Sequence, residues 1–225
     1  MSLLVWLPLH GNLTNYGISP AKFSMVNSSG GLETTTAGKT GGAAYQRTKI
    51  NTADYITSDI SFTLDKDVSM ACWCKITAHS TNNSANGIIT QHGHSTGGLG
   101  ITMRYISAND YRMSINTGLN GDSSGSSDRT YMTYYGNTNI YNAWHHLCVT
   151  YNHITKKIQM YVDGKLETIQ GYGESITIAG NNSTARPFRL FDWSTDYSSN
   201  PSYKPNCLLN DVRLYDHCLN PREIK

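Results

Sequence analysis

Trp144–Asn152 (WHHLCVTYN) and Ile158–Lys165 (IQMYVDGK) are the stretch of sequence that decides the fold. Residues 146–151 and 158–162 are short runs of apolar, aromatic and β-branched side chains, which predict strands. Asp163-Gly164 separates the second run from residues 165–169, and an Asp-Gly pair in this position is a strong signal for a hairpin turn. This region therefore predicts antiparallel strands joined by short turns.

The same kind of pattern extends toward both ends of the chain. In Ser69–Thr77 the residues alternate, so that one face of the expected strand carries Met70, Cys72, Cys74 and Ile76 and the other Ala71, Trp73 and Lys75. Further strands are predicted at Leu99–Tyr105, Tyr111–Ile115 and Asp211–Tyr215. A helical start is predicted only at Asn220–Lys225, with Asn220 as the cap and Pro221 in the first turn. The sequence predicts an all-β fold, an antiparallel sandwich of two sheets that forms a single domain over residues 1–225.

Composition excludes several classes of protein. The net charge of +2 gives no basic stripe for nucleic acid, and only 15% of the 225 residues are charged, against roughly 25% on average. No apolar run approaches the roughly 20 residues that cross a bilayer, so we expect no membrane insertion. Met1–Leu9 lacks a basic start and contains Pro8, which predicts a first strand and not a secretory signal. The five cysteines are an odd number in a chain long enough to build a core, and we expect reduced thiols in a protein made in the cytosol.

Catalytic patterns are weak in this sequence. Glycoside hydrolysis needs two carboxyl groups across the scissile bond, yet the chain has only four glutamates, and Asp65-Lys66-Asp67 is its one acid-X-acid triplet. No Gly-X-Ser-X-Gly elbow and no phosphate-binding glycine loop is present. We therefore expect no catalytic residues. Two acids distant in the sequence could still converge, so a polysaccharide hydrolase stays open as an alternative.

Cysteine and histidine pairs do not have the spacing of a zinc site. Cys72-X-Cys74 and Cys148 lie among apolar residues, where a free cysteine packs as a small apolar side chain. His92-Gly-His94 is expected to be a loop pair. Core packing is therefore the favoured interpretation of the cysteines.

Two polar segments, Gly118–Asn142 and Trp193–Pro205, carry clustered aromatic residues and are predicted to be loops at the rim of the sandwich. Sugars are bound by aromatic rings that stack on their C–H faces, together with amides and carboxylates that bond their hydroxyl groups. The candidate ligand-binding residues of the two segments are Tyr131, Tyr134, Tyr135, Asn137, Tyr141, Asp192, Trp193, Asp196, Tyr197 and Tyr203. Tyrosine also suits structural packing and subunit contacts, so that alternative stays open. Because Tyr134 and Tyr135 point to opposite faces of an extended segment, we expect one of them to be buried.

Several segments together carry a resemblance to a known family. The opening stretch, with Leu209–Asp216 and Cys218–Ile224, resembles the "W-h-H … h-Y-h-D-G" and "D-x-R-h-Y … L-s-x-x-E-I" segments of concanavalin A-like, laminin-G-type jelly rolls. Asn51–Ile56 and Met70–Lys75 are similar to the earlier "x-D-Y-h" and "h-s-x-W-h-K" strands. The order of these segments, which span nearly the whole chain, implies that family's two-sheet jelly roll.

The resemblance implies a possible metal site, because many members of the family carry structural calcium. Asp54 matches the family's acid before an aromatic residue, and Asp211 the acid that opens the last strand. Calcium needs several oxygen ligands, and the residues before Asp54 are Thr52 and Ala53, so a second acid is lacking there. Both aspartates could instead cap turns.

Members of this family mostly bind glycans or proteins, and a minority are catalytic. The first residues, Leu3–Asn12, are similar to sandwich domains at the start of bacteriophage virion proteins, which are made in the host cytoplasm without a signal peptide. This similarity implies a non-enzymatic binding module of a phage tail or fibre, located on the virion, with host-surface polysaccharide or another glycan as partner. A domain that only contacts other virion subunits, or forms a homo-oligomer, is the alternative.

Overall fold

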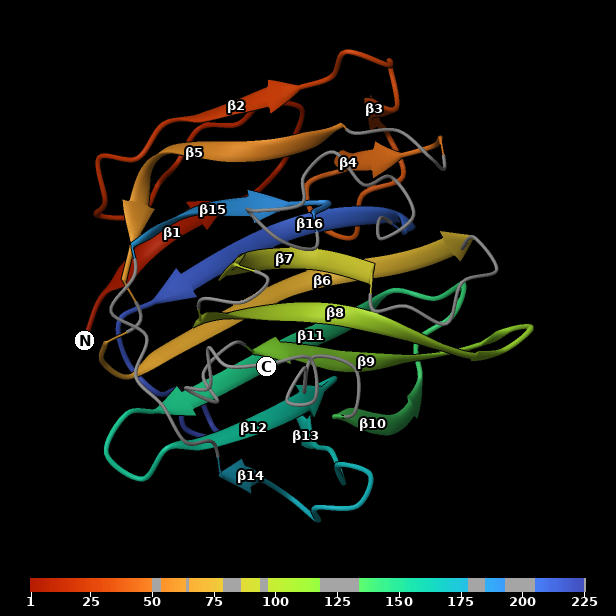
Figure 1. Ribbon diagram of the computed structural model, residues 1–225. Helices are drawn as coiled ribbons and strands as arrows, with labels where there is room; N and C mark the ends of the chain where they lie inside the picture. Colours follow the sequence, from red (N-terminus) through yellow and green to blue (C-terminus); the bar gives the residue numbers. More distant parts are fainter. Residues whose placement is uncertain are drawn as a thin grey trace.

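Two antiparallel sheets pack face to face and form a jelly-roll sandwich (Figure 1). The structure is a computed structural model and describes residues 1–49, 54–63, 65–78, 86–93, 97–117, 134–177, 185–192 and 205–224. Within these ranges the elements are strands. The predicted all-β fold is confirmed.

The first sheet, here called sheet A, contains the hairpin that opened the sequence. Its strands, in spatial order, are β13 (Lys165–Leu166), β12 (Lys157–Val162), β11 (His145–Asn152), β6 (Val68–Ala78), β16 (Asn206–Tyr215), β4 (Ala44–Arg47) and β3 (Leu32–Thr35). β1 (Leu3–Leu7) also pairs with β16, and β14 (Ile176–Thr177) pairs with β12. Strands from both ends of the chain thus share one sheet.

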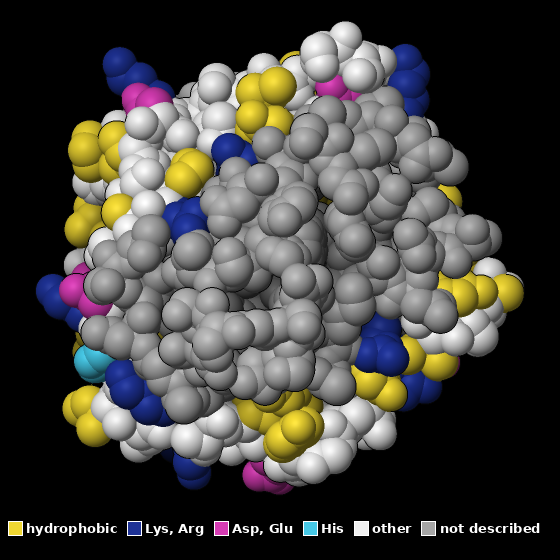
Figure 2. Space-filling view, in the orientation of Figure 1, with side chains coloured by type: hydrophobic (Ala, Val, Ile, Leu, Met, Phe, Trp, Pro, Cys, Tyr) yellow, Lys and Arg dark blue, Asp and Glu magenta, His cyan; other side chains and the backbone are white. Residues whose placement is uncertain are grey.

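The second sheet, sheet B, lies in front of sheet A in the view of Figure 1. Its spatial order is β10 (Tyr135–Asn139), β9 (Asp110–Thr117), β8 (Gly97–Ser107), β7 (Asn86–Gly93), β15 (Arg186–Leu190), β5 (Tyr55–Phe62) and β2 (Phe23–Val26). On the face shown in Figure 2, the described Lys and Arg side chains are scattered and do not gather into one basic patch. In the described ranges, no helix has the length and apolarity needed to span a membrane.

The predicted hairpin forms at Asp163-Gly164. Both residues have positive φ, 53° and 75°, as the tight turn between twisted strands requires. The Asp163 carboxylate accepts a hydrogen bond from the backbone N–H of His146 at 2.9 Å, which fastens the turn to β11. The following strand is shorter than predicted, because only Lys165 and Leu166 pair with β12.

The core fills the space between the sheets. On β6 the predicted apolar face, Met70, Cys72, Cys74 and Ile76, is fully or almost fully buried. On its opposite face Ala71 is also buried, because Leu219 and Ile224 of the C-terminal segment pack over it and over Cys148. The predicted helical start in that segment is a single capped turn, in which Asn220 accepts the backbone N–H of Arg222 at 2.9 Å.

All five cysteines are free, and only Cys218 is not fully buried. Burial raises the pKa of the Cys72, Cys74 and Cys148 thiols, which keeps them in the unreactive thiol form.

We predict that a thiol reagent such as Ellman's reagent at pH 8 modifies at most Cys218 in the folded protein and all five cysteines in guanidinium chloride. Burial both excludes the reagent and suppresses the thiolate. A Cys218→Ser variant, the control, should lose the native signal. Rapid modification of two or more native thiols would contradict this core.

Candidate functional site

The two predicted loops are described only in part. Residues 134–142 of the first segment and Pro205 of the second lie in the described ranges, as does Asp192 beside it. Tyr131, Trp193, Asp196, Tyr197 and Tyr203 lie outside the described residues, so their predicted roles stay predictions.

The chain leaves sheet B in opposite directions at the starts of these two segments. β9 ends at Thr117, which pairs with Leu99 at the start of β8. β15 runs the other way, because Leu190 pairs with Ile89 and the chain continues toward the beginning of β7. No local sequence pattern indicates this divergence, because it depends on the register of the sheet.

Tyr134 and Tyr135 point to opposite sides of sheet B, as predicted from their adjacency. Tyr134 is 6% exposed and packs edge-on against Tyr172, with ring centroids 4.9 Å apart. Tyr135 is half-buried, and the guanidinium of Arg104 lies over its ring at 4.5 Å from the centroid. Tyr134 is therefore a core residue, and a ligand contact by Tyr135 stays a prediction.

Polar side chains surround Tyr135 and form what we call the β10 edge cluster, defined as Arg104, Arg112, Tyr135, Asn137 and Gln170. Arg112 is held by Asp110 through two hydrogen bonds of 3.1 and 3.0 Å, and this contact raises its pKa. The Asn137 side-chain oxygen accepts hydrogen bonds from Arg112, at 3.4 Å, and from Gln170. The cluster thus combines one aromatic ring, two guanidinium groups and two amides.

Buried Glu167 holds the backbone of this cluster in place. Its carboxylate accepts the backbone N–H groups of Asn137, at 2.6 Å, and Thr138, at 3.0 Å, and also the Thr138 hydroxyl. A Cβ atom at Gly136 would collide with the carboxylate, so the close approach needs glycine there. Sequence reasoning missed Glu167 as a site residue, because an isolated glutamate after a hairpin carries no local signal.

Tyr141 belongs to a stack of tyrosines beside the cluster. Its ring stacks on Tyr111 at 4.9 Å, and Tyr111 meets Tyr105 edge-on at 5.5 Å. Tyr105 and Tyr141 pack against the core cluster, which gives Tyr141 a structural contact in addition to its predicted role.

Asp192 is fully buried at the end of β15. Its carboxylate pairs with Arg189 at 2.9 Å, and the Arg189 guanidinium lies over the Tyr55 ring at 4.5 Å. Asp192 and Asp54 also act on buried Arg47 of β4: burial lowers the pKa of Arg47 to about 10, and the two carboxylates oppose that shift. Asp192 thus takes part in a group of buried charges between the sheets.

The two aspartates predicted to bind calcium have other partners in this structure. The two carboxylate oxygens of Asp54 accept the backbone N–H groups of Ser29 and Gly31, at 3.0 and 2.8 Å. Asp211 accepts the indole N–H of Trp6 at 2.8 Å and two hydrogen bonds from Arg213 at 2.9 Å. Among the described residues, no group of three or more His, Cys, Asp or Glu could hold a metal. Calcium binding by Asp54 and Asp211 stays a prediction.

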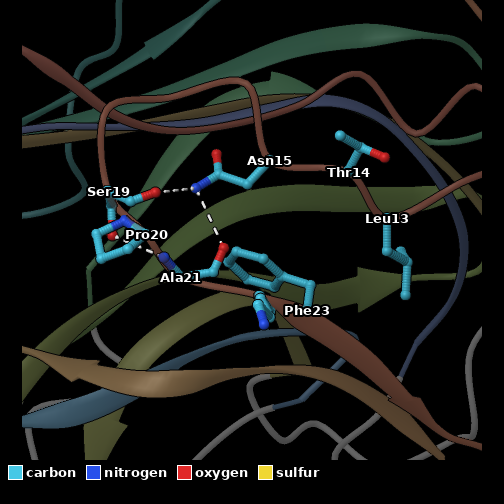
Figure 3. A pocket seen from close by; sticks show the side chains of 8 residues that line it. Leu13, Thr14, Asn15, Ser19, Pro20, Ala21 and Phe23 are labelled. Carbon is cyan, nitrogen blue, oxygen red and sulfur yellow. Dashed lines mark hydrogen bonds between the residues drawn. The ribbon is translucent and has the colours of Figure 1, made fainter.

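A pocket of about 430 Å³ lies between Leu13 and Phe23 (Figure 3). Its polar side chain Asn15 forms hydrogen bonds within the loop. The Asn15 amide donates to the backbone carbonyls of Ser19, at 2.9 Å, and Ala21, at 3.4 Å. The Asn15 oxygen accepts the backbone N–H of Trp6 at 2.9 Å. This pocket is therefore part of a loop fastened to β1.

One protein family matches most of this chain. A sequence model described as the concanavalin A-like lectin/glucanases superfamily, of the laminin G type, matches residues 50–225. A comparison with curated protein sequences finds no match.

Solved structures share the fold at low identity. The binding domain of Paraclostridial Mosquitocidal Protein 1 matches with 13% identity and a TM-score of 0.58, over 99% of this chain and 51% of that one. Trypanosoma rangeli sialidase in complex with sialic acid matches with 12% identity and a TM-score of 0.63, over 99% and 32%. Domain 4 of an extracellular arabinanase from Geobacillus stearothermophilus, in complex with arabinotriose, matches with 15% identity and a TM-score of 0.56, over 99% and 96%. The chain thus spans about half of the toxin domain and a third of the sialidase.

We predict that Glu167→Gln lowers the free energy of unfolding by about 2–3 kcal/mol, because the carboxylate that binds two β10 backbone N–H groups and the Thr138 hydroxyl becomes a neutral amide with one acceptor oxygen. Urea unfolding measures this loss. Exposed Glu174→Gln is the matched control and should change stability by less than about 0.5 kcal/mol. Equal effects of the two substitutions would contradict the role given to Glu167.

Proposed function

The chain belongs to the concanavalin A-like lectin/glucanase superfamily, and on this premise we propose that it is a non-catalytic module that binds carbohydrate. The binding surface that the described residues carry is the β10 edge cluster, and the roles expected of the other residues of Gly118–Asn142 and Trp193–Pro205 stay predictions. Fold alone does not decide function in this superfamily, so the proposal depends on the cluster.

The arrangement of Arg104, Tyr135 and Asn137 is the observation that carries the proposal. The guanidinium of Arg104 lies over the half-buried Tyr135 ring, so an aromatic ring and fixed hydrogen-bond donors stand side by side. Arg112 and Gln170 hold the Asn137 amide in one orientation. Such a set of fixed donors and acceptors beside a ring suits the hydroxyl groups and C–H faces of a sugar.

The buried carboxylates of Glu167 and Asp192 support a binding role in preference to hydrolysis. Glu167 is bound by the β10 backbone, and Asp192 is paired with Arg189. A glycosidase needs one carboxyl group free to donate a proton and a second to act as nucleophile or base. Both of these buried carboxylates have structural partners instead.

The named relatives support the same class of function. The arabinanase domain was solved with arabinotriose, and the mosquitocidal protein structure is a binding domain. By analogy, the partner of this chain is a glycan or a glycan-bearing receptor.

The setting we propose is a phage tail or fibre, located on the virion, with host-surface polysaccharide as the ligand. Weak single sites then gain avidity from repeated copies, whether through a homo-oligomer or through contacts with other virion subunits. A domain that only contacts virion subunits is the alternative.

We predict that a multivalent display of the protein binds a subset of a bacterial glycan array, and that Tyr135→Ala weakens this binding by about tenfold through loss of the aromatic contact. Ile154→Ala, at an 86% exposed position in the turn after β11, is the matched control and should bind as the native protein does. Silence across the array, or equal binding by both variants, would refute the proposal.

A further inference from the structure

We propose a second saccharide site on the outer face of sheet A, built for a sugar ring that carries a carboxylate. Its residues, which we call the indole platform, are Trp6, Tyr16, Lys39, Trp73, His146 and Arg213. It lies on the opposite side of the sandwich from the outer face of sheet B, and it does not depend on the β10 edge cluster.

Strand register brings the platform together from four strands. His146 of β11 pairs with Trp73 of β6, so both side chains leave the same face. On the neighbouring strand β16, Arg213 pairs with Ala71 on one side and with Trp6 of β1 on the other. The two indoles therefore lie on one sheet face, although they are 67 positions apart in the chain (73 − 6).

The Trp6 half of the platform is rigid. Asp211 accepts the Trp6 indole N–H at 2.8 Å and binds the Arg213 guanidinium through two hydrogen bonds of 2.9 Å. Tyr16, 58% exposed, lies against the indole with ring centroids 5.7 Å apart, and its backbone N–H donates to the Trp6 carbonyl at 2.9 Å.

A cavity of about 250 Å³ adjoins this half. It is lined by Trp6, Pro8, His10, Asn12 and Tyr16. Its aromatic wall and its polar rim give it the features of a small-ligand pocket, and its volume suits a single sugar ring better than a larger ligand.

The Trp73 half carries a polar group without a partner. His146 is 9% exposed, its ring centroid lies 5.4 Å from that of Trp73, and its Nδ1 is buried without a hydrogen bond. Burial lowers the pKa of His146, so the ring is neutral at pH 7. A proton on Nδ1 would be a buried donor without an acceptor, which favours the tautomer with its N–H on Nε2. That tautomer places a fixed donor beside an indole ring.

Charge favours an acidic sugar over a neutral one. Lys39 Nζ lies 4.6 Å from the centre of the Trp73 ring, and Lys75 follows Trp73 two positions along the same face. Within the described part of the chain neither lysine forms an ion pair. Arg213 is paired with Asp211, and Asp163 adds one negative charge beside His146, so Lys39 and Lys75 leave one net positive charge around Trp73. A carboxylate on a ring stacked at the indole complements that charge.

The platform lies on the part of the outer face of sheet A that the C-terminal segment and the loop at Thr40 do not cover. The C-terminal segment covers Ala71 and Cys148 with Leu219 and Ile224. On the other side, the Asn210 side-chain oxygen accepts a hydrogen bond from the backbone N–H of Thr40 at 2.7 Å. This bond fixes the loop that carries Lys39. Trp6 and Trp73 stay half-buried between these covers.

The test uses protein with ¹⁵N-labelled tryptophan, which gives one indole signal for each of the four tryptophans. Oligosaccharides of galacturonate, glucuronate and N-acetylneuraminate are titrated in, alongside their carboxyl methyl esters, which keep the ring and lose the charge. We expect at least one acid to shift the Trp6 and Trp73 signals, and its ester to bind about three- to tenfold more weakly.

Variants separate this site from the proposed function. Lys39→Gln, at an exposed position, should weaken binding of the acid about threefold, and Trp73→Ala should abolish the shift at Trp6. Tyr135→Ala should leave the platform signals unchanged, and it is the variant that tests the β10 edge cluster. The inference is overturned if no acid shifts either signal, if esters bind as well as acids, or if Lys39→Gln has no effect.

Discussion

The pairing of β6 with β11 on one side and with β16 on the other is the constraint on which this structure depends. Through it a strand from the middle of the chain joins the last strand and the hairpin at Asp163-Gly164. The pairing fixes the side chains of β6 on two faces: Met70, Cys72 and the other inward residues form the core, and Trp73 faces outward. A shift of one residue would exchange the two faces, so burial of the core selects the register.

Carboxylates complete the ends and edges of the sheets. Asp54, Asp163 and Glu167 each accept backbone N–H groups, and Asp211 binds an indole and a guanidinium. An acid in these positions satisfies donors that would otherwise be buried without a partner, which costs about 1–3 kcal/mol per group. In a chain with few charged residues, these acids serve structure, and the surfaces that can contact a ligand use tyrosine, tryptophan, arginine and amides.

The two binding surfaces differ in how they arise. The β10 edge cluster is built from one sheet edge and stabilised by Glu167 behind it. The indole platform comes from the outer face of the other sheet, where the chain termini cover one part and leave another open. A sandwich can carry two sites because each sheet has an outer face that the shared core does not occupy.

The sequence alone determined the strands β6, β8, β9, β11 and β12, the hairpin turn and the inward face of β6, because alternation and turn chemistry are local. It also determined that Tyr134 and Tyr135 would separate, since neighbours on a strand point to opposite faces. Only the tertiary structure decided that Glu167 supports β10, that Asp211 binds Trp6, and that Trp6 and Trp73 share a face. Those contacts join residues far apart in the chain, and they follow from sheet order and register, which no local pattern encodes.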